Sequence, residues 1–527
     1  MFAVTRRHGL GLALAAAAAG SARAQPARNV MVGGFDVGPG GFPKNFNPLS
    51  ATAGFMWLNC YYETLLLYNP ELTKVGGALA KTFEANADGS QYTFHLVDDA
   101  KWHDGTPFTS ADVKFTFELV MDRRAGSVFA GRFADLDGVD TPDPHTAVLK
   151  LKKPNGSVPD QLTRLMMLPE HALGKLPREG LDRNPWWSTT PIGTGPFAFV
   201  KYVSDQYVEL KANADYRRGK PRLDGLINRY FENTAGAVAA QKAGEIQFTY
   251  VEPDDAKSFA NDASVRIIEG DSWVINFIGF NHLLPIWKDL RVRQAVMHAI
   301  NREGIVKQIM GGAATVANAP YVSPSVVPKD LDPYPYDPAK AKALLQAAGW
   351  EQLAGGRDLT LMTYYNNPLS ANILAAVQAM LGQVGIKITP RLVDVPTYAG
   401  TVAAPKPDPW QFPLIFAGAQ DGPDPGGVSV SLMSNGFPPA GNNQARVDLP
   451  ELDAAFTTAI ATVDPAKRNA AFQQVSRIVN KELPWATMWV TRRFGVVSKQ
   501  VENFIWTPAP GGGSYDAAPE KWAFRKT

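Results

Sequence analysis

Residues 100–118, "AKWHDGTPFTSADVKFTFE", carry the densest set of local structural signals in this chain. Asp104 followed by Gly105 is typical of a tight turn, and Pro107 restricts the backbone where the chain leaves that turn. Ser110 stands where the N-cap of a helix is expected, directly before a run that mixes apolar and charged residues. The stretch therefore predicts a turn that leads into a helix.

Sequence motifs for catalysis are absent from the chain. His103 and Asp104 could bind a metal or act as an acid–base pair, but the turn and the helix explain the same residues. No histidine stands at a tight metal-ligand spacing, and there is no G-x-S-x-G elbow and no G-x-x-x-x-G-K-[ST] phosphate loop. We therefore expect no catalytic residue, no metal and no cofactor, and we predict that the chain is not an enzyme.

The stretch "WHDGTPFTSADVKFTFE" resembles the signature of the extracellular solute-binding proteins of the peptide and nickel group (solute-binding family 5), which serve ABC importers. Seven matches in the family's order make the resemblance specific, although Val97 stands where the family commonly has a basic residue. The six other stretches are "PIGTGPFAFVKY", "NADYRRGKPRLDGL", "AVAAQKAGEI", "LRVRQAVMHAINREGIV", "YDPAKAKALLQAAGW" and "DPAKRNAAFQQVSRIV".

The resemblance implies an α/β fold of the type II periplasmic binding proteins, with two lobes joined by a hinge and a subdomain inserted in lobe I. The ligand of such a protein lies between the lobes, which close over it. Changes in sequence pattern near residues 75, 190 and 285 agree with this division. The predicted segments are 1–24 for a signal peptide, 26–74 with 193–280 and 487–527 for lobe I, 75–192 for the inserted subdomain, and 281–486 for lobe II.

The second half of the chain alternates between helix and strand patterns. Residues 359–365 and 386–394 have strand patterns, and the helix pattern between them ends at Gly385, so we predict a β-α-β unit with parallel strands. Residues 287–312 predict a helix that ends at a glycine pair. Asp337, followed by proline, is placed as the N-cap of another helix.

The first 24 residues have the features of a secretory signal peptide. Arg6 and Arg7 precede an apolar run of about 12 residues, which is too short to span a bilayer, and an Ala-x-Ala site predicts cleavage before Gln25. The paired arginines suggest the twin-arginine export route. Cys60 lies too far past the cleavage site to carry the lipid of a lipoprotein. We therefore expect a periplasmic protein.

Charge and cysteine content exclude several other classes of protein. Removal of the signal, with its three arginines, leaves 49 basic and 50 acidic residues, against 52 and 50 in the whole chain. This balance gives no electrostatic reason to bind nucleic acid. Cys60 is the only cysteine, so no intramolecular disulfide can form. No stretch after the signal is long and apolar enough for a transmembrane helix.

A loop at residues 417–427, "AGAQDGPDPGG", holds the candidate ligand anchor. Peptide-binding members of the family have a W-x-x-D-x-x-D-P stretch whose first aspartate pairs with the peptide's α-ammonium, and the resemblance places Asp421 at that position. Gly418 stands where the tryptophan is expected, so one wall of the usual peptide cleft is missing, and Ala419 lies beside it. Asp424, before a proline, is assigned to holding the turn.

A second stretch, "GGFPKNFNPLS", is similar to one in oligosaccharide-binding members as well as in some peptide binders. It makes Phe46 and Asn47 candidate ligand contacts. Trp273 and Trp489 could supply aromatic faces to a cleft, although packing in a core explains a tryptophan equally simply. Asn281, near the expected hinge, could contact the ligand or cap the backbone where it crosses between the lobes.

The resemblance implies binding without chemistry. We expect a monomer that captures a peptide or a similar amine-bearing solute, closes, and docks on the permease subunits of an ABC transporter in the inner membrane. An oligosaccharide is the alternative ligand. A nickel or metal complex and a hydrolase activity rank below it, because the sequence shows no histidine-rich pocket and no catalytic constellation.

Overall fold

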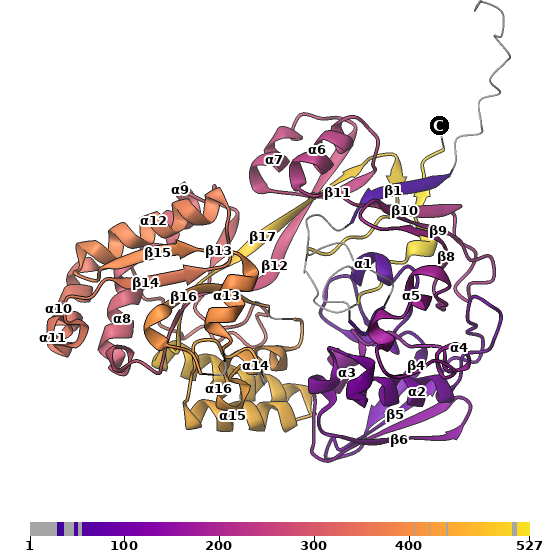
Figure 1. Cartoon of the computed structure of the whole chain (residues 1–527), viewed down its shortest axis with the longest axis horizontal. Helices are drawn as coiled ribbons and strands as arrows, with labels where there is room; N and C mark the ends of the chain where they lie inside the picture. Colours follow the sequence, from indigo (N-terminus) through magenta and orange to yellow (C-terminus); the bar gives the residue numbers. More distant parts are fainter. Residues whose placement is uncertain are drawn as a thin grey trace, which may run out of the picture.

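The structure is a computed structural model that describes residues 29–35, 47–50, 55–404, 406–420, 422–438, 441–508 and 514–526. The predicted signal peptide, Phe46 and Asp421 lie outside these residues. Two bodies lie side by side in Figure 1, an indigo-to-magenta body from the first half of the chain and an orange one from the second. We keep the names lobe I, inserted subdomain and lobe II for the predicted segments, whose bounds stay a prediction.

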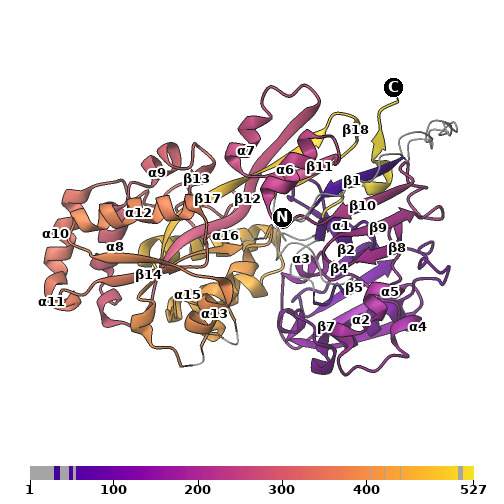
Figure 2. The same cartoon turned by 45° about the horizontal axis from the view of Figure 1, so that its top comes forward.

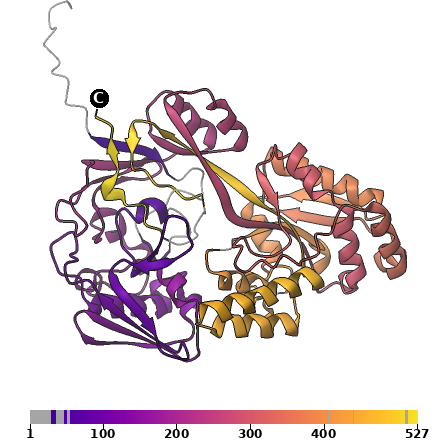
Figure 3. The same cartoon turned by 180° about the vertical axis from the view of Figure 1, so that it is seen from behind.

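One large sheet runs through both lobes. Its strand order is β15-β14-β16-β12-β17-β11-β1-β10-β9-β8, with β13 paired to β17 outside this path. The two longest strands, β12 (Val265–Phe280) and β17 (Trp485–Ser498), pair antiparallel at the centre of the sheet. Figure 3 shows these two strands passing from one body to the other. They are the connection on which a hinge motion would depend.

Lobe I supplies one end of this sheet. Figure 2 shows β1, β10, β9 and β8 next to one another. Two helices, α6 (Thr234–Lys242) and α7 (Pro253–Ser258), flank β11 in the sequence, and Gly244 after α6 has a φ of +72° as expected for a helix stop. The strands are β1 (Val30–Gly34), β8 (Phe197–Val203), β9 (Tyr207–Ala212), β10 (Gly225–Arg229) and β11 (Phe248–Val251).

The segment predicted as an inserted subdomain contains a separate four-stranded antiparallel sheet. Its order is β4-β5-β7-β6, and α2 (Ser110–Met121) packs on β6 and β7. The strands are β4 (Ala80–Ala85), β5 (Gln91–Leu96), β6 (Leu136–Asp143) and β7 (Thr146–Leu151), and the short helices include α3 (Val158–Leu162), α4 (Glu170–Leu173) and α5 (Trp186–Thr189).

The opening stretch folds as a turn and a helix, with one correction. The Asp104 carboxylate accepts a hydrogen bond from the backbone N–H of Thr106 at 3.0 Å, as a turn-forming aspartate does. The N-cap of α2 is Thr109 and not Ser110, because Asp112 reaches back to the Thr109 backbone N–H at 2.9 Å. Ser110 is the first helical residue, and its hydroxyl donates to the Asp143 carbonyl at 2.6 Å.

Lobe II contains the predicted β-α-β unit. Strands β14 (Leu359–Thr363) and β15 (Ile388–Leu392) pair in parallel and are joined through α12 (Pro368–Gln383). Gly385 follows α12 with a φ of +93°, so the predicted helix end is confirmed. Strand β16 (Leu414–Gln420) then lies between β14 and β12.

The helix predicted over residues 287–312 is two helices. Helix α8 (Leu290–Ala299) ends at Ile300, whose backbone is extended, and α9 (Arg302–Gln308) begins after Asn301. The Asn301 side chain accepts a hydrogen bond from the Gly304 N–H at 2.8 Å and so caps the new helix. The apolar pattern continued through this break, which is why periodicity alone did not reveal it.

Helix α10 starts at Asp337 as predicted, and the other helices of lobe II follow. Asp337 caps α10 (Pro338–Ala348) by accepting from the Lys340 N–H at 2.9 Å, and Asp464 caps α16 (Pro465–Glu482) in the same way through Lys467. The others are α11 (Trp350–Ala354), α13 (Val395–Val402), α14 (Ser429–Leu432) and α15 (Pro450–Ala461).

Each lobe has its own hydrophobic core. One core joins lobe I and the inserted subdomain and includes Trp57 and Trp522, whereas two further cores lie in lobe II and include Trp287 and Trp485. Separate cores allow two bodies to move as units. Among the described residues, no helix is both long and apolar enough to cross a membrane.

Candidate functional site

The two crossing strands stay paired with each other in two runs. Residues 265–271 of β12 pair with residues 492–498 of β17, and residues 275–279 of β12 pair with residues 485–490. The register is irregular between Asp271 and Ile275, where Trp273 has a φ of +57°. Residues 274–280 also pair with β16, a strand of the predicted lobe II segment. Local sequence pattern does not show pairing between strands so far apart in the chain.

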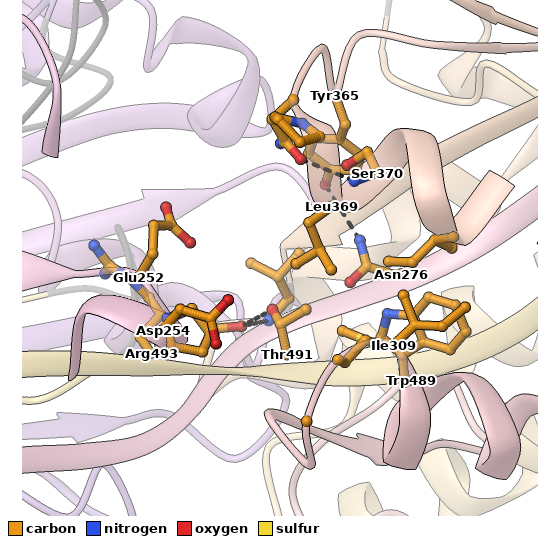
Figure 4. A pocket seen from close by; sticks show the side chains of 18 of the residues that line it. Glu252, Asp254, Asn276, Ile309, Tyr365, Leu369, Ser370, Trp489, Thr491 and Arg493 are labelled. Atoms are coloured by element: carbon orange, nitrogen blue, oxygen red, sulfur yellow. Dashed lines mark hydrogen bonds between the residues drawn. The ribbon is translucent and has the colours of Figure 1, made fainter. Parts of the chain in front are cut away.

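A cavity of about 910 Å³ lies over this crossing and is lined from both lobes. Its volume lies within the range of small-molecule and cofactor pockets. Figure 4 shows the labelled side chains gathered around it from α7, the crossing strands, α9 and the start of α12. The lining residues used below are Glu252, Asp254, Lys257, Asn276, Ile309, Tyr365, Leu369, Phe416, Trp489 and Arg493.

The two sides of this cavity differ in chemistry. The lobe I side carries charged groups of both signs. Glu252 and Asp254 are acidic, and Lys257 and Arg493 are basic. The Arg493 guanidinium lies 4.3 Å from the centre of the Tyr250 ring, so a cation–π contact holds it in place. A ligand with both charged and polar groups would therefore find partners of either sign on this side.

The lobe II side is mainly apolar and aromatic. Ile309 and Leu369 lie at the cavity, and Phe416 packs near Trp489 with ring centroids 6.0 Å apart. Pockets of this kind bind organic ligands through apolar contact, with a few polar groups to fix orientation. The cavity therefore suits a ligand that combines an apolar part with hydrogen-bonding or charged groups.

Gly418, in β16, lies behind Tyr365, Val274 and Asn276, three residues that line this cavity. It pairs directly across the sheet with Asn276, and a Cβ atom at Gly418 would overlap the Tyr365 hydroxyl and lie 2.7 Å from Val274 Cγ1. The space that a larger residue at this position would need is thus taken by Tyr365. Tyr365, which lines the cavity, therefore lies in front of Gly418.

The Tyr365 hydroxyl is held by two neighbours. It accepts a hydrogen bond from Asn276 Nδ2 at 3.3 Å and lies 3.4 Å from the Tyr364 hydroxyl. Burial, with the nearby Tyr364, raises the pKa of Tyr365 well above its ordinary value, so the phenol stays neutral. These contacts fix a polar group at an otherwise apolar wall.

One known protein family matches most of this chain. The family described as bacterial extracellular solute-binding proteins, family 5 Middle, matches residues 74–437. This chain belongs to that family. The sequence-based recognition and the fold class are therefore confirmed.

Known relatives match this solute-binding protein over nearly its whole length. A Brucella ovis protein named as an ABC transporter peptide-binding protein is 56% identical over 497 residues, covering 94% of each chain. The oligopeptide-binding protein AppA of Bacillus subtilis, solved with a nonapeptide, has a TM-score of 0.78 at 26% identity and covers 94% of this chain and 99% of AppA. NikZ of Campylobacter jejuni, solved with Ni(L-His), has a TM-score of 0.80 at 25% identity with the same coverage.

Two of the candidate site residues of this solute-binding protein have structural hydrogen bonds. Asn281 is buried, and its amide donates to the carbonyls of Pro409 and Phe412, at 3.3 and 3.4 Å, while its oxygen accepts from the Leu283 N–H. Asn47 is also buried and accepts from the Leu49 N–H at 2.9 Å. Of the two roles considered for Asn281, the structure assigns the backbone cap.

The two tryptophan candidates, Trp273 and Trp489, lie in different surroundings. Trp489 lines the cavity at the edge of the lobe II core, where only 1% of its surface is exposed. Trp273 is half-buried against the core of lobe I at the irregular point of β12 and does not line this cavity. Ala419 is buried and packs in a lobe II core, so its side chain faces away from Gly418's side of the strand. Of these candidates, Trp489 lines the cavity, whereas Gly418, Trp273 and Ala419 do not.

Asp424 holds its turn as predicted and also joins the lobes. Its carboxylate accepts from the Gly426 N–H at 2.6 Å and pairs with Arg468 of α16 at 2.9 Å. Ser157, from the inserted subdomain, donates to the same carboxylate at 3.2 Å. A backbone hydrogen bond from the Gly156 N–H to the Ile460 carbonyl, 2.7 Å long, lies close by. This face is a direct contact between the inserted subdomain and lobe II.

Sequence reasoning missed Asn276 and Tyr365. Asn276 stands inside an apolar strand run, and an asparagine there was a signal because buried strands seldom contain one. Tyr365 is the second residue after β14, at the carboxyl end of a parallel strand, where ligand-binding residues often lie in such sheets. Neither signal predicts that the two side chains contact each other, since 89 residues separate them in the sequence.

Proposed function

We propose that this solute-binding protein captures peptides with a free α-ammonium between its lobes and delivers them to the permease of an ABC importer. The observation that carries the proposal is the interlobe cavity, which offers an apolar and aromatic wall on lobe II and charged groups on lobe I. The peptide-binding names of the Brucella ovis relative and of AppA agree with it.

Strand β16 supports an extended ligand. Its residues 414 and 415 pair with β14, whereas residues 416–420 have β12 on one side and no strand on the other within the described part of the chain. A strand edge of this kind can hydrogen-bond an extended peptide backbone, while side-chain pockets give specificity. The strand ends at Gln420, directly before Asp421, the proposed anchor of the ammonium.

The proposal extends to location and partners. The family is extracellular, and the N-terminal sequence supports export to the periplasm by a cleaved signal, with the arginine pair favouring the twin-arginine route. A single binding protein that closes and docks on the permease subunits requires no second copy, so we propose a monomer. No catalytic step is part of this function.

A thermal-shift screen of the mature protein tests the ligand class. The panel contains di- to nonapeptides, their N-acetylated forms, cello- and xylo-oligosaccharides, and Ni(L-His). Free peptides should stabilise the protein by about 2.7 kcal/mol at one hundred times Kd, and recovery of the peptide intact should show that it is not cleaved. A shift with sugars or with Ni(L-His), and none with peptides, would contradict the proposal.

A further inference from the structure

One polar atom at the interlobe cavity has no partner in the described part of the chain. Asn276 is only 4% exposed, and its Nδ2 donates to the Tyr365 hydroxyl. Its Oδ1 is buried and has no hydrogen-bond donor among the described residues. Figure 4 shows the amide with its nitrogen toward Tyr365 and its oxygen pointing away from that hydroxyl, and Asn276 is one of the residues that line the cavity. A buried amide oxygen without a donor is rare in folded proteins, because its lost contact with water is not replaced.

The glycine opposite Asn276 makes this arrangement possible. Asn276 and Gly418 are direct partners across β12 and β16, and Asn276 Nδ2 would lie 3.5 Å from a Cβ at Gly418. A side chain there would displace the Tyr365 hydroxyl, which holds the Asn276 amide in its orientation. Gly418 and Tyr365 therefore act as positioning residues for Asn276.

We propose that Asn276 Oδ1 is a specificity-determining acceptor that binds a hydrogen-bond donor of the ligand, the amide N–H of an extended peptide. The identity of the donor rests on the proposed function. The acceptor lies on the apolar side of the cavity, where water does not compete for its hydrogen bond. Loss of this bond should therefore weaken ligand binding strongly. A ligand that places a methylene or an ester oxygen at this point would leave Oδ1 without a partner and bind less well.

Calorimetric titration with tetra-alanine tests this inference. The panel adds three tetra-alanine analogues, each with one backbone amide replaced by an ester, and compares the wild type with Asn276→Leu. We expect Asn276→Leu to weaken tetra-alanine binding about 10-fold. For the wild type, one of the ester analogues should bind about 10-fold less well than tetra-alanine. For Asn276→Leu, the same analogue and tetra-alanine should bind equally well. Equal affinities of the two proteins, or a loss that no single ester reproduces, would overturn the inference.

Thermal unfolding of the ligand-free protein gives a second, independent measurement. Asn276→Leu and Tyr365→Phe both lose the bond between Asn276 Nδ2 and the Tyr365 hydroxyl, and only Asn276→Leu also removes the acceptor that is satisfied only by ligand. Asn276→Leu should therefore have a Tm equal to or higher than that of Tyr365→Phe. A Tm below that of Tyr365→Phe would assign Oδ1 a structural role and overturn the inference. If tetra-alanine does not bind the wild type, the proposed function fails and this unfolding result still decides the role of Asn276. Asn261→Leu is the matched control, since Asn261 is exposed and does not line the cavity.

Discussion

At the residue scale, Gly418 and Tyr365 form one close contact beside the interlobe cavity. The expected tryptophan is absent at Gly418, and the Tyr365 hydroxyl occupies the space that a side chain there would need. Because Tyr365 lines the cavity, a side chain at Gly418 would displace part of the cavity wall.

Gly418→Ala should weaken peptide binding about 10-fold and lower the free energy of unfolding by about 1–3 kcal/mol, because the new methyl group overlaps the Tyr365 hydroxyl. Titration calorimetry and urea unfolding measure the two effects. Gly382→Ala in α12 is the control, since no atom lies within 4 Å of its Cβ position and alanine favours a helix. Equal behaviour of the two variants would contradict this description of the wall.

His103, in the opening stretch, should make stability depend on pH. Its Nδ1 accepts from the Gly193 N–H at 3.2 Å and its Nε2 lies 3.0 Å from the Gly195 carbonyl, so the ring is neutral in the fold. Burial lowers the pKa of His103 to about 4 from 6.5. The unfolded chain therefore binds the proton more readily, and stability is present above pH 6.5 and is lost as the pH falls toward 4.

The loss attributable to this ring is about 3 kcal/mol at pH 4. Urea unfolding of the wild type and His103→Gln between pH 4 and 8 measures it. Glutamine can keep both hydrogen bonds but does not titrate, so its unfolding free energy should fall less steeply with acid. Parallel pH profiles for the two proteins would show that His103 does not carry the effect. The same ring geometry supports the structural role over a metal or acid–base role.

At the scale of elements, the sequence predicted what is local. The β-α-β unit and the start of α10 depend on strand patterns, on Gly385 and on Asp337, all within a few residues of the features they determine. The break between α8 and α9 was missed because an apolar pattern ran through it. The pairing of β12 with β17 and β16, and the Asn276–Tyr365 contact, join segments far apart in the chain, so local pattern could not predict them.

Helix α16 takes part in two ion pairs, a buried one that should contribute strongly to stability and an exposed one that should contribute little. Arg468 and Asp424 are nearly buried, with side chains 12% and 7% exposed, at the contact with the inserted subdomain. Arg468→Met leaves a buried carboxylate without its cation, and we expect the free energy of unfolding to fall by about 3–5 kcal/mol. Guanidinium unfolding monitored by circular dichroism measures it.

Arg477→Met in the same helix is the matched control. Its pair with Asp330 is exposed, and such pairs contribute about 0–1 kcal/mol. The double variant Asp424→Leu/Arg468→Met should recover much of the lost stability, because it removes both charges. Equal losses for Arg468→Met and Arg477→Met would refute the assignment of the lobe contact to the buried pair.

At the scale of the whole molecule, two bodies with separate cores are joined by β12 and β17, and the interlobe cavity lies over that junction. A peptide held from both sides would favour the closed arrangement by its difference in affinity for the open and closed forms. Capture and release then need no chemistry. The central claim is that a peptide is bound between the lobes and that Asp421 pairs with its ammonium.

Titration calorimetry of tetra-alanine and N-acetyl-tetra-alanine against the wild type and Asp421→Asn tests that claim most directly. Removing one partner of a buried charged pair costs about 2–5 kcal/mol, so acetylation should weaken binding to the wild type by that amount and should have little further effect on Asp421→Asn. Equal affinity of the wild type for the free and acetylated peptides, or unchanged binding by Asp421→Asn, would contradict the account.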